Sequence, residues 1–251
     1  MIQLQDAALA PTVTGEVPLR NISWSVQRGE WWVVTGPPSC GKSALLQTLG
    51  VLHPVSQGEL RLFGRTISST MGDELAAIRR GVGLLFEGGG HLFEHSTVFE
   101  NVALPLRYHH DLSLDDAAEQ VRPTLEACGL EGIAGQALRH VSRALRRRVA
   151  LARTLALRPE IMLLDNPAGG LDPGQIRWWR GFLSQLHAGH PLFDQQPMTL
   201  VLATDDLRPW LPFGQQFAMV RDQTLSQLGT REDLRGRHAK LLAQLLAEDL
   251  R

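Results

Sequence analysis

Residues 36–43 read Gly36-Pro37-Pro38-Ser39-Cys40-Gly41-Lys42-Ser43. This octapeptide has the G-x-x-x-x-G-K-[ST] spacing of a phosphate-binding P-loop, in which backbone N–H groups and a helix N-terminus surround phosphate oxygens. An apolar run, Trp31–Val34, precedes the loop, and a helical pattern, Ala44–Leu49, follows it. The alternative is a glycine turn that holds a lysine by chance, but the strand–loop–helix context favours a phosphate site.

We therefore predict that the loop binds a nucleotide through all eight residues from Gly36 to Ser43. The Lys42 ammonium is expected to reach the outer phosphates, and the Ser43 hydroxyl is expected to bind Mg²⁺. The run Ile161–Asp165 adds a second signal, because four apolar residues end there in an acid. Asp165 is expected at the carboxyl edge of a buried strand, where it would hold the same Mg²⁺.

Composition limits the possible functions. With 251 residues, the chain can form one large α/β domain or one domain with a subdomain. Its formal net charge of −1 gives no overall field that would attract nucleic acid. No apolar run approaches the ~20 residues that span a bilayer, and the first residues lack the pattern of a signal peptide. The two cysteines, Cys40 and Cys128, indicate neither a disulfide framework nor a metal site.

The remaining pattern alternates between strand-like and helical segments. Strand-like runs cover Ile2–Leu9, Val17–Val26, Glu59–Phe63, Gly83–Phe86, Met198–Ala203 and Phe217–Leu228. Helical patterns cover Asp73–Arg80, most of Ser113–Leu157, and Arg231–Leu250, whereas Pro191–Pro197 is expected to be a loop. Short apolar runs without alternation fit parallel strands that are covered on both faces. The expected fold is an α/β core that a helical subdomain interrupts, with Trp31 and Trp32 on a buried strand.

With these motifs in this order, the chain resembles the ATP-binding subunits of ABC transporters over nearly its whole length. That family has a P-loop, Q-loop, signature motif, Walker B strand, D-loop and H-loop. In this chain they correspond to Gly36–Ser43, Glu87, Val141–Leu145, Ile161–Asp165, Gly169–Asp172 and Asp205. The segments Leu85–Phe93 and Val98–Leu106 look most like the Mla/MCE-type phospholipid transporter ATPases.

The resemblance implies a P-loop NTPase core of mostly parallel sheet, with an N-terminal antiparallel β part and an inserted α-helical subdomain. Residues 1–251 would form a single ATP-binding domain, with the Q-loop and helical subdomain at about 88–158 and a C-terminal helix at about 231–250. The cofactors would be ATP and Mg²⁺. Ser43, Glu87 and Asp165 are the candidate metal ligands.

The family also implies partners. Two ATP-binding subunits, identical or different, would enclose ATP between the P-loop of one and the signature of the other. Ser142, Arg143 and Ala144 would then contact the nucleotide of the partner subunit. Membrane permease subunits would dock beside the Q-loop and hold the protein on the cytoplasmic face of the membrane, and an MCE-type lipid-binding chain is a further candidate. The arginines at 146–148 lie on the signature helix and are interpreted as a solvated or phosphate-facing stripe, not as a nucleic-acid site.

The departures from the family pattern are informative. Asn166 replaces the glutamate that polarises the attacking water, Asp205 replaces the H-loop histidine, and Glu87 replaces the Q-loop glutamine. Loss of a positioned general base typically lowers a rate by about 10²–10⁴-fold. An aspartate ~5 Å from the γ-phosphate repels it by roughly 3 kcal/mol at an effective dielectric near 20.

The signature departs as well, because Arg143 and Ala144 stand where the family has two glycines. Arg143 either blocks the partner's nucleotide or holds it as a substitute clamp. We therefore predict a subunit that binds MgATP but hydrolyses it weakly or not at all. The alternatives are an active ATPase in which Glu87 or Asp172 supplies the missing carboxylate, and a nucleotide-sensing interaction protein without a transport role.

Overall fold

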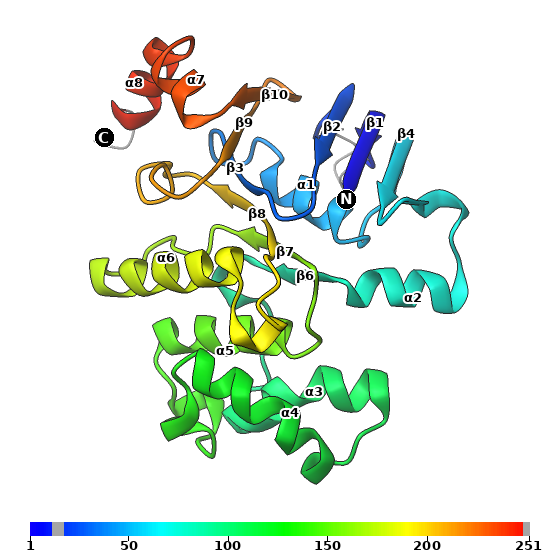
Figure 1. Ribbon diagram of the computed structural model, residues 1–251, viewed down its shortest axis with the longest axis vertical. Coiled ribbons are helices and arrows are strands. Elements are labelled where there is room, and N and C mark those ends of the chain that lie inside the picture. Colours follow the sequence, from blue (N-terminus) through cyan, green and yellow to red (C-terminus); the bar gives the residue numbers. More distant parts are fainter. Residues whose placement is uncertain (12–17, 248–251) are drawn as a thin grey trace.

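The centre of the molecule is a six-stranded sheet in the order β10-β9-β3-β8-β7-β6 (Figure 1). The computed structural model describes residues 1–11 and 18–247. The strands are β3 (Trp31–Thr35), β6 (Val82–Leu85), β7 (Ile161–Asp165), β8 (Thr199–Thr204), β9 (Gln216–Arg221) and β10 (Thr224–Gly229). β9 and β10 pair antiparallel, and the other neighbouring strands of this sheet pair parallel.

The apolar strands are buried on both faces of this sheet. Trp31 and Val33 pack into one core, while Trp32 and Val34 of the same strand pack into the other. Residues of β7 and β8 divide between the two cores in the same alternating way. Because both faces exclude water, every second residue need not be polar, which explains the continuous apolar runs in the sequence. The prediction that Trp31 and Trp32 are core residues is confirmed.

A second sheet covers one face of the large sheet in the order β2-β1-β4-β5. Its strands are β1 (Ile2–Leu9), β2 (Ile22–Val26), β4 (Val55–Leu62) and β5 (Arg65–Thr66), and their pairing is antiparallel. In β2 the buried Ile22, Trp24 and Val26 alternate with exposed serines, as expected when one face of a sheet meets a core. Helix α1 (Lys42–Leu49) contributes Leu45, Leu46 and Leu49 to the same core.

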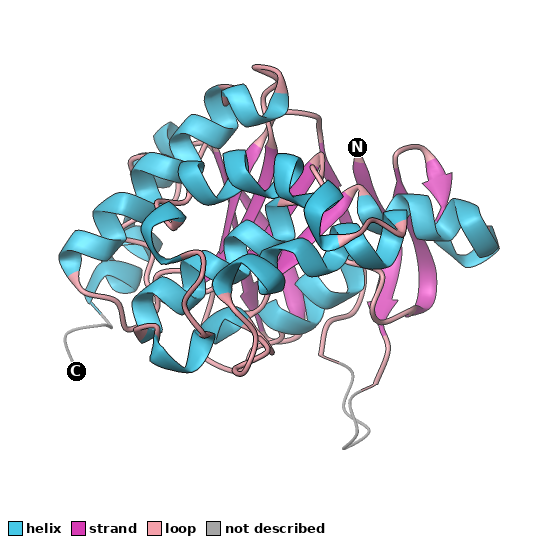
Figure 2. Cartoon of the chain, turned by 90° about the horizontal axis from the view of Figure 1, so that it is seen from below, coloured by secondary structure: helices cyan, strands magenta, loops and turns pink. Residues whose placement is uncertain are grey.

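Helices cover the opposite face of the large sheet. They are α3 (Val98–His110), α4 (Leu114–Ala127), α5 (Arg143–Leu155) and α6 (Pro173–Ala188). Figure 1 shows α3, α4 and α5 together at one end of the molecule, and Figure 2 shows helices lying in front of the large sheet when it is seen from that end. The predicted fold class, a mostly parallel core with an antiparallel part and an inserted helical subdomain, is confirmed. No helix in residues 1–11 and 18–247 combines the length and apolarity needed to cross a bilayer.

Several elements differ from the sequence expectations. Helix α3 lies before the helical stretch predicted from Ser113 onward, and Pro105 inside it conceals its helical pattern. The single helix predicted at about 231–250 is instead two helices, α7 (Arg231–Arg235) and α8 (Ala239–Ala247), because the chain turns at Gly236. The predicted residues 248–250 and Val17 lie outside the described chain. Helix α2 (Gly72–Arg80) agrees with its prediction, and the expected loop at 191–197 contains a short 3-10 helix, Pro191–Phe193.

The double-sided burial of the large sheet gives a stability prediction. Leu163 of β7 is fully buried, whereas Leu52 in the turn after α1 is 52% exposed. We expect Leu163→Ala to lower the free energy of unfolding by about 2–5 kcal/mol, because it leaves a cavity in the core. The matched change Leu52→Ala should stay within about 0.5 kcal/mol of the parent. Urea unfolding measures both, and equal losses would contradict the described packing of β7.

Candidate functional site

The register of four parallel strands brings the predicted site residues to one edge of the sheet. Thr35 at the end of β3 pairs with Thr204 at the end of β8. Asp165 pairs with Ala203, and Leu85 at the end of β6 pairs with Leu164. The P-loop, Asn166, Asp205 and Glu87 each follow one of these strand ends within two residues, so they meet at the carboxyl edge, where ligands of α/β proteins bind.

These residues line one cavity of about 360 Å³. Its wall includes Pro38, Ser39, Gly41, Lys42 and Ser43 of the P-loop, together with Glu87, Asp165, Asn166 and Asp205. Gly36, Pro37 and Cys40 contact the site from inside the loop through the Lys42 side chain. The structure therefore brings together the eight loop residues, the Walker B carboxylate and the three replaced family positions.

The loop has the backbone shape that its glycines permit. At Gly36, with φ +153°, an added Cβ would lie 2.2 Å from the Val220 carbonyl oxygen, so a larger residue would displace β9. Gly41, with φ +107°, is the N-cap of α1 and directs the first N–H groups of that helix toward the cavity. Ser39 also has a positive φ of 60°, a conformation that disfavours non-glycine residues by roughly 1–2 kcal/mol.

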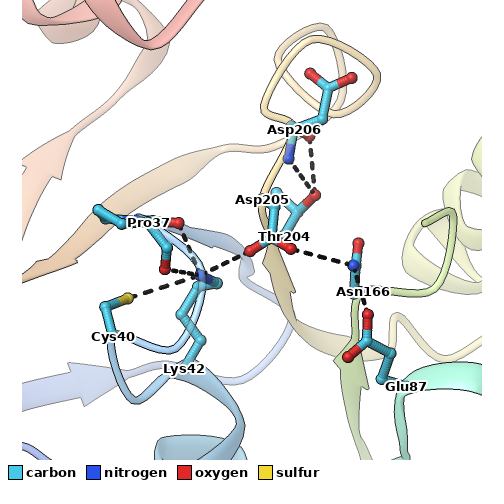
Figure 3. Close-up of polar contacts among 9 residues, drawn as sticks. Pro37, Cys40, Lys42, Glu87, Asn166, Thr204, Asp205 and Asp206 are labelled. Atoms are coloured by element: carbon cyan, nitrogen blue, oxygen red, sulfur yellow. Dashed lines mark hydrogen bonds and ion pairs between the residues drawn. The ribbon is translucent and has the colours of Figure 1, made fainter. Parts of the chain in front are cut away.

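Lys42 is almost fully buried, and its ammonium already has protein partners. Nζ donates to the carbonyl oxygens of Gly36 and Pro37, each at 2.7 Å. It also forms an ion pair with Asp205, whose Oδ1 lies 2.8 Å away (Figure 3). An ammonium has three N–H donors, so each donor of Lys42 has an oxygen acceptor within the protein.

The three replaced family positions form one hydrogen-bonded network with Lys42. The Asn166 amide nitrogen donates to Glu87 Oε1 at 2.9 Å and to Asp205 Oδ2 at 3.4 Å. Figure 3 shows Asn166 between Glu87 and Asp205, and Asp205 between Asn166 and Lys42. An amide nitrogen has two hydrogens and can serve two carboxylates, whereas a glutamate at position 166 would bring a third negative charge between them. The replacements are therefore compatible with one another as a group.

Asp165 has a chemical environment that suits a cation. Burial raises the pKa of its carboxyl above 3.8, the negative Glu87 and Asp205 raise this pKa further, and a hydrogen bond from Ser43 and the nearby Lys42 oppose the rise. A bound Mg²⁺ would stabilise the ionised carboxylate and would accept the Ser43 hydroxyl as a ligand, so these two oxygens fit the ion.

The protein ligands alone do not form a closed metal cage. Within the described ranges, no cluster of three or more histidine, cysteine, aspartate or glutamate side chains is placed to hold a metal ion. This agrees with Mg²⁺ chemistry, in which one or two carboxylates act together with waters and phosphate oxygens. Glu87 lines the same cavity, but its Oε1 is engaged by Asn166.

The signature residues lie apart from this cavity. Ser142 caps α5 by accepting a hydrogen bond from the Leu145 N–H, and Arg143 and Ala144 occupy the first turn of that helix. Arg143 is exposed and lines a separate cavity of about 560 Å³ with Arg146 and His91. Their predicted contact with a nucleotide of another subunit requires a second chain and remains a prediction.

The interpretation of Arg146–Arg148 as a solvated or phosphate-facing stripe is wrong for two of the three residues. Arg147 is buried and donates to the Gly169 carbonyl oxygen at 2.5 Å, which joins the signature helix to the loop after Asn166. The Arg148 guanidinium lies 3.8 Å from the centre of the Trp178 ring. Sequence reasoning missed both contacts, although a basic run that continues into the apolar Val149–Leu151 signals that its helix is partly enclosed.

Comparisons with known proteins agree with this geometry. A family model described as ABC transporter matches residues 19–169. The chain is 30% identical over 214 residues to the intermembrane phospholipid transport system ATP-binding protein MlaF of Haemophilus influenzae, a match that covers 85% of this chain and 78% of that protein. It is also 30% identical to the spermidine/putrescine import ATP-binding protein PotA of Thermotoga maritima, over 84% of this chain and 54% of PotA.

Among solved structures, the chain is similar to a dimeric post-hydrolysis state of the ATP-binding cassette MJ0796 bound to ADP and Pi. The TM-score is 0.78 at 27% sequence identity, and the match covers 91% of this chain and 99% of that one. A second dimeric structure, described as a bacterial ABC transporter cassette, matches with a TM-score of 0.78 at 28% identity and covers 90% of this chain and 96% of the other.

The two cysteines allow a direct test of the cavity. Burial raises the pKa of the Cys128 thiol to about 12, so at pH 8 it carries almost no reactive thiolate. Cys40 is only half-buried, and its Sγ lies 3.6 Å from Lys42 Nζ. We expect iodoacetamide to label Cys40 in the native protein, MgADP or MgATP to slow that labelling, and Cys128 to react only after unfolding in urea. Mass spectrometry of the peptides measures the labelling of both cysteines. A rate of Cys40 labelling that is the same with and without nucleotide would contradict the predicted site.

Proposed function

The chain belongs to the ABC transporter family of ATP-binding subunits, and on that premise we propose that it serves a lipid transporter, binds MgATP, and hydrolyses it weakly or not at all. The observation that carries the proposal is the Asn166 amide, which stands next to Asp165 and donates to Glu87 and Asp205. An amide does not accept a proton from water near neutral pH, so the position has no general base.

The groups that bind nucleotide are retained. The N–H groups of the loop and of the first turn of α1 would hold the phosphates, Lys42 would contact the outer phosphates, and Ser43 with Asp165 would hold Mg²⁺. The bound ATP supplies the phosphoanhydride that family members cleave. The chain thus keeps binding groups while it lacks the groups that position and activate water, which supports a role for the nucleotide as a structural clamp.

The proposed lipid substrate rests on similarity to one branch of the family. MlaF of Haemophilus influenzae, whose name denotes intermembrane phospholipid transport, aligns over most of both chains. The segment Leu85–Phe93, with its three glycines at 88–90, carries the same subfamily pattern. PotA matches at the same identity but extends well beyond this chain. Coverage separates the chain only from the longer PotA, so the segment Leu85–Phe93 carries the proposal of a phospholipid and makes an MCE-type lipid-binding chain a proposed partner.

The proposed permease contact lies beside the Q-loop. A cavity of about 400 Å³ there is lined mainly by apolar residues of β6, α3 and α5. Phe86 and Tyr108 line this cavity and are 39% and 80% exposed, and exposed apolar or aromatic side chains that gather around one groove are typical of an interaction site. We propose that permease subunits cover this groove and hold the chain on the cytoplasmic face of the membrane, with a second ATP-binding subunit completing the dimer.

The structure also bears on the rival hypothesis, an active ATPase in which Glu87 or Asp172 acts as the general base. The Asp172 carboxylate caps α6 by accepting hydrogen bonds from the N–H groups of Gly174 and Gln175 at 2.8 and 3.0 Å. Moving it toward the cavity would uncap that helix at a cost of about 1 kcal/mol. Glu87 lines the cavity and is therefore the better placed candidate. A rate of phosphate release that is unchanged in both Glu87→Gln and Asp172→Asn would remove this rival.

Phosphate release tests the proposed loss of chemistry. We expect the purified chain to release little phosphate from MgATP. Asn166→Glu/Asp205→His should increase the rate by roughly 10²-fold or more, because it returns a general base and a hydrogen-bond donor to the site. Asn166→Glu alone should restore little, because the new carboxylate would lie between Glu87 and Asp205. Phosphate is measured with an enzyme-coupled assay. Rapid turnover by the parent chain that Lys42→Ala abolishes would contradict the proposal.

A further inference from the structure

Asp205 is held in place at both carboxylate oxygens. Oδ1 pairs with Lys42 Nζ at 2.8 Å, and Oδ2 accepts from the Asn166 amide nitrogen at 3.4 Å. The residue directly follows β8, whose last residue pairs with the last residue of β3 before the P-loop. Strand pairing, an ion pair and a hydrogen bond therefore all place this carboxylate against the P-loop lysine.

The neighbouring Asp206 shows that this placement is specific to one residue of the turn. Asp206 directs its carboxylate to Arg208, with Oδ1 2.8 Å from Nε and Oδ2 2.9 Å from Nη2. In Figure 3 its carboxylate points away from Lys42. Two adjacent aspartates thus have different roles, and only Asp205 faces the nucleotide cavity.

We propose that Asp205 is a specificity-determining residue that acts as a tethered substitute for a terminal phosphate, so that the site selects nucleoside diphosphates over triphosphates. The inference rests on the proposed nucleotide binding and goes beyond it. The ion-paired Asp205 carboxylate is an anion on Lys42 Nζ, the group that a P-loop directs to the outermost phosphates.

A diphosphate can bind without removing this anion. Its two phosphates would occupy the loop N–H groups and the N-terminus of α1, which are formed by the backbone and do not depend on Asp205. Lys42 could exchange its Gly36 or Pro37 carbonyl partner for a phosphate oxygen and still keep Asp205. The tethered carboxylate and the diphosphate would then share the lysine.

A triphosphate needs the space and the cation that Asp205 uses. Its third phosphate must approach Lys42 from the cavity, where the lining includes one ammonium, Lys42, and three carboxylates, Glu87, Asp165 and Asp205. Mg²⁺ compensates part of the charge of either nucleotide. The two nucleotides therefore differ in binding free energy chiefly through the added phosphate beside Asp205. Displacing Asp205 breaks its ion pair and leaves its charge close to that phosphate, whereas the histidine of the family pattern would donate a hydrogen bond to it.

Binding measurements with charge-neutral variants test the inference. Isothermal titration calorimetry on the full chain with Mg²⁺ would compare ADP with a non-hydrolysable ATP analogue, adenylyl imidodiphosphate. We expect the parent to bind ADP roughly 10-fold to 100-fold more tightly than the triphosphate analogue. Asp205→Asn, and Asp205→Ser as a second variant, should reduce this ratio to about 1 or below, chiefly through tighter binding of the analogue. Asp206→Asn is the matched control and should keep the parent ratio.

The outcomes separate this inference from the proposed function. Equal affinities for the two nucleotides in the parent, or a ratio that Asp205→Asn and Asp205→Ser leave unchanged while both variants unfold at the parent's midpoint, would overturn the role of Asp205 and leave nucleotide binding intact. Absence of binding to the parent and to each variant would overturn the proposed nucleotide binding and the inference with it. A preference for ADP that disappears in both Asp205 variants and persists in Asp206→Asn supports the inference.

Discussion

The parallel pairing of β3 with β8 and of β8 with β7 is the constraint on which the site depends. It sets Thr35 beside Thr204 and Asp165 beside Ala203, so the residues that follow these strand ends must share one edge of the sheet. Burial on both faces holds that pairing in place, because a one-residue slip would exchange the side chains between the two cores. The relative positions of Lys42, Asn166 and Asp205 are therefore consequences of the core, and small changes of sequence at the edge act on a fixed framework.

On that framework the replaced positions act as a group. Asn166 joins Glu87 to Asp205, and Asp205 joins this pair to Lys42. Each replacement alone would leave a charge or a donor without its partner, whereas together they satisfy one another. This network shows how a chain that belongs to a family of ATP-binding subunits can keep the loop at Gly36–Ser43 while an amide, Asn166, follows the carboxylate of Asp165. Restoring a single family residue at one of these positions would therefore remove a hydrogen bond or an ion pair from the network.

The sequence predicted the parts of this picture that depend on local pattern. The strand before Gly36 and the acid at the end of β7 follow from apolar runs and motif spacing, and the antiparallel N-terminal sheet follows from the family resemblance. Contacts between residues that are distant in the sequence could not be predicted. Asn166 and Asp205 read as two separate losses, because the order of residues does not show that one amide donates to two carboxylates. Local exceptions also misled, because Pro105 conceals α3, Gly236 divides the C-terminal helix, and Arg147 is charged but buried.

The most direct test of the account is a crystal structure of the chain with Mg²⁺ and ADP. We expect the diphosphate in the loop at Gly36–Ser43, Mg²⁺ at Ser43 and Asp165, and Asp205 still within hydrogen-bonding distance of Lys42 Nζ and the Asn166 amide. A structure in which ADP occupies the loop while Asp205 has turned into solvent and Asn166 holds a water for attack would contradict the claim that these residues form one network that occupies the lysine.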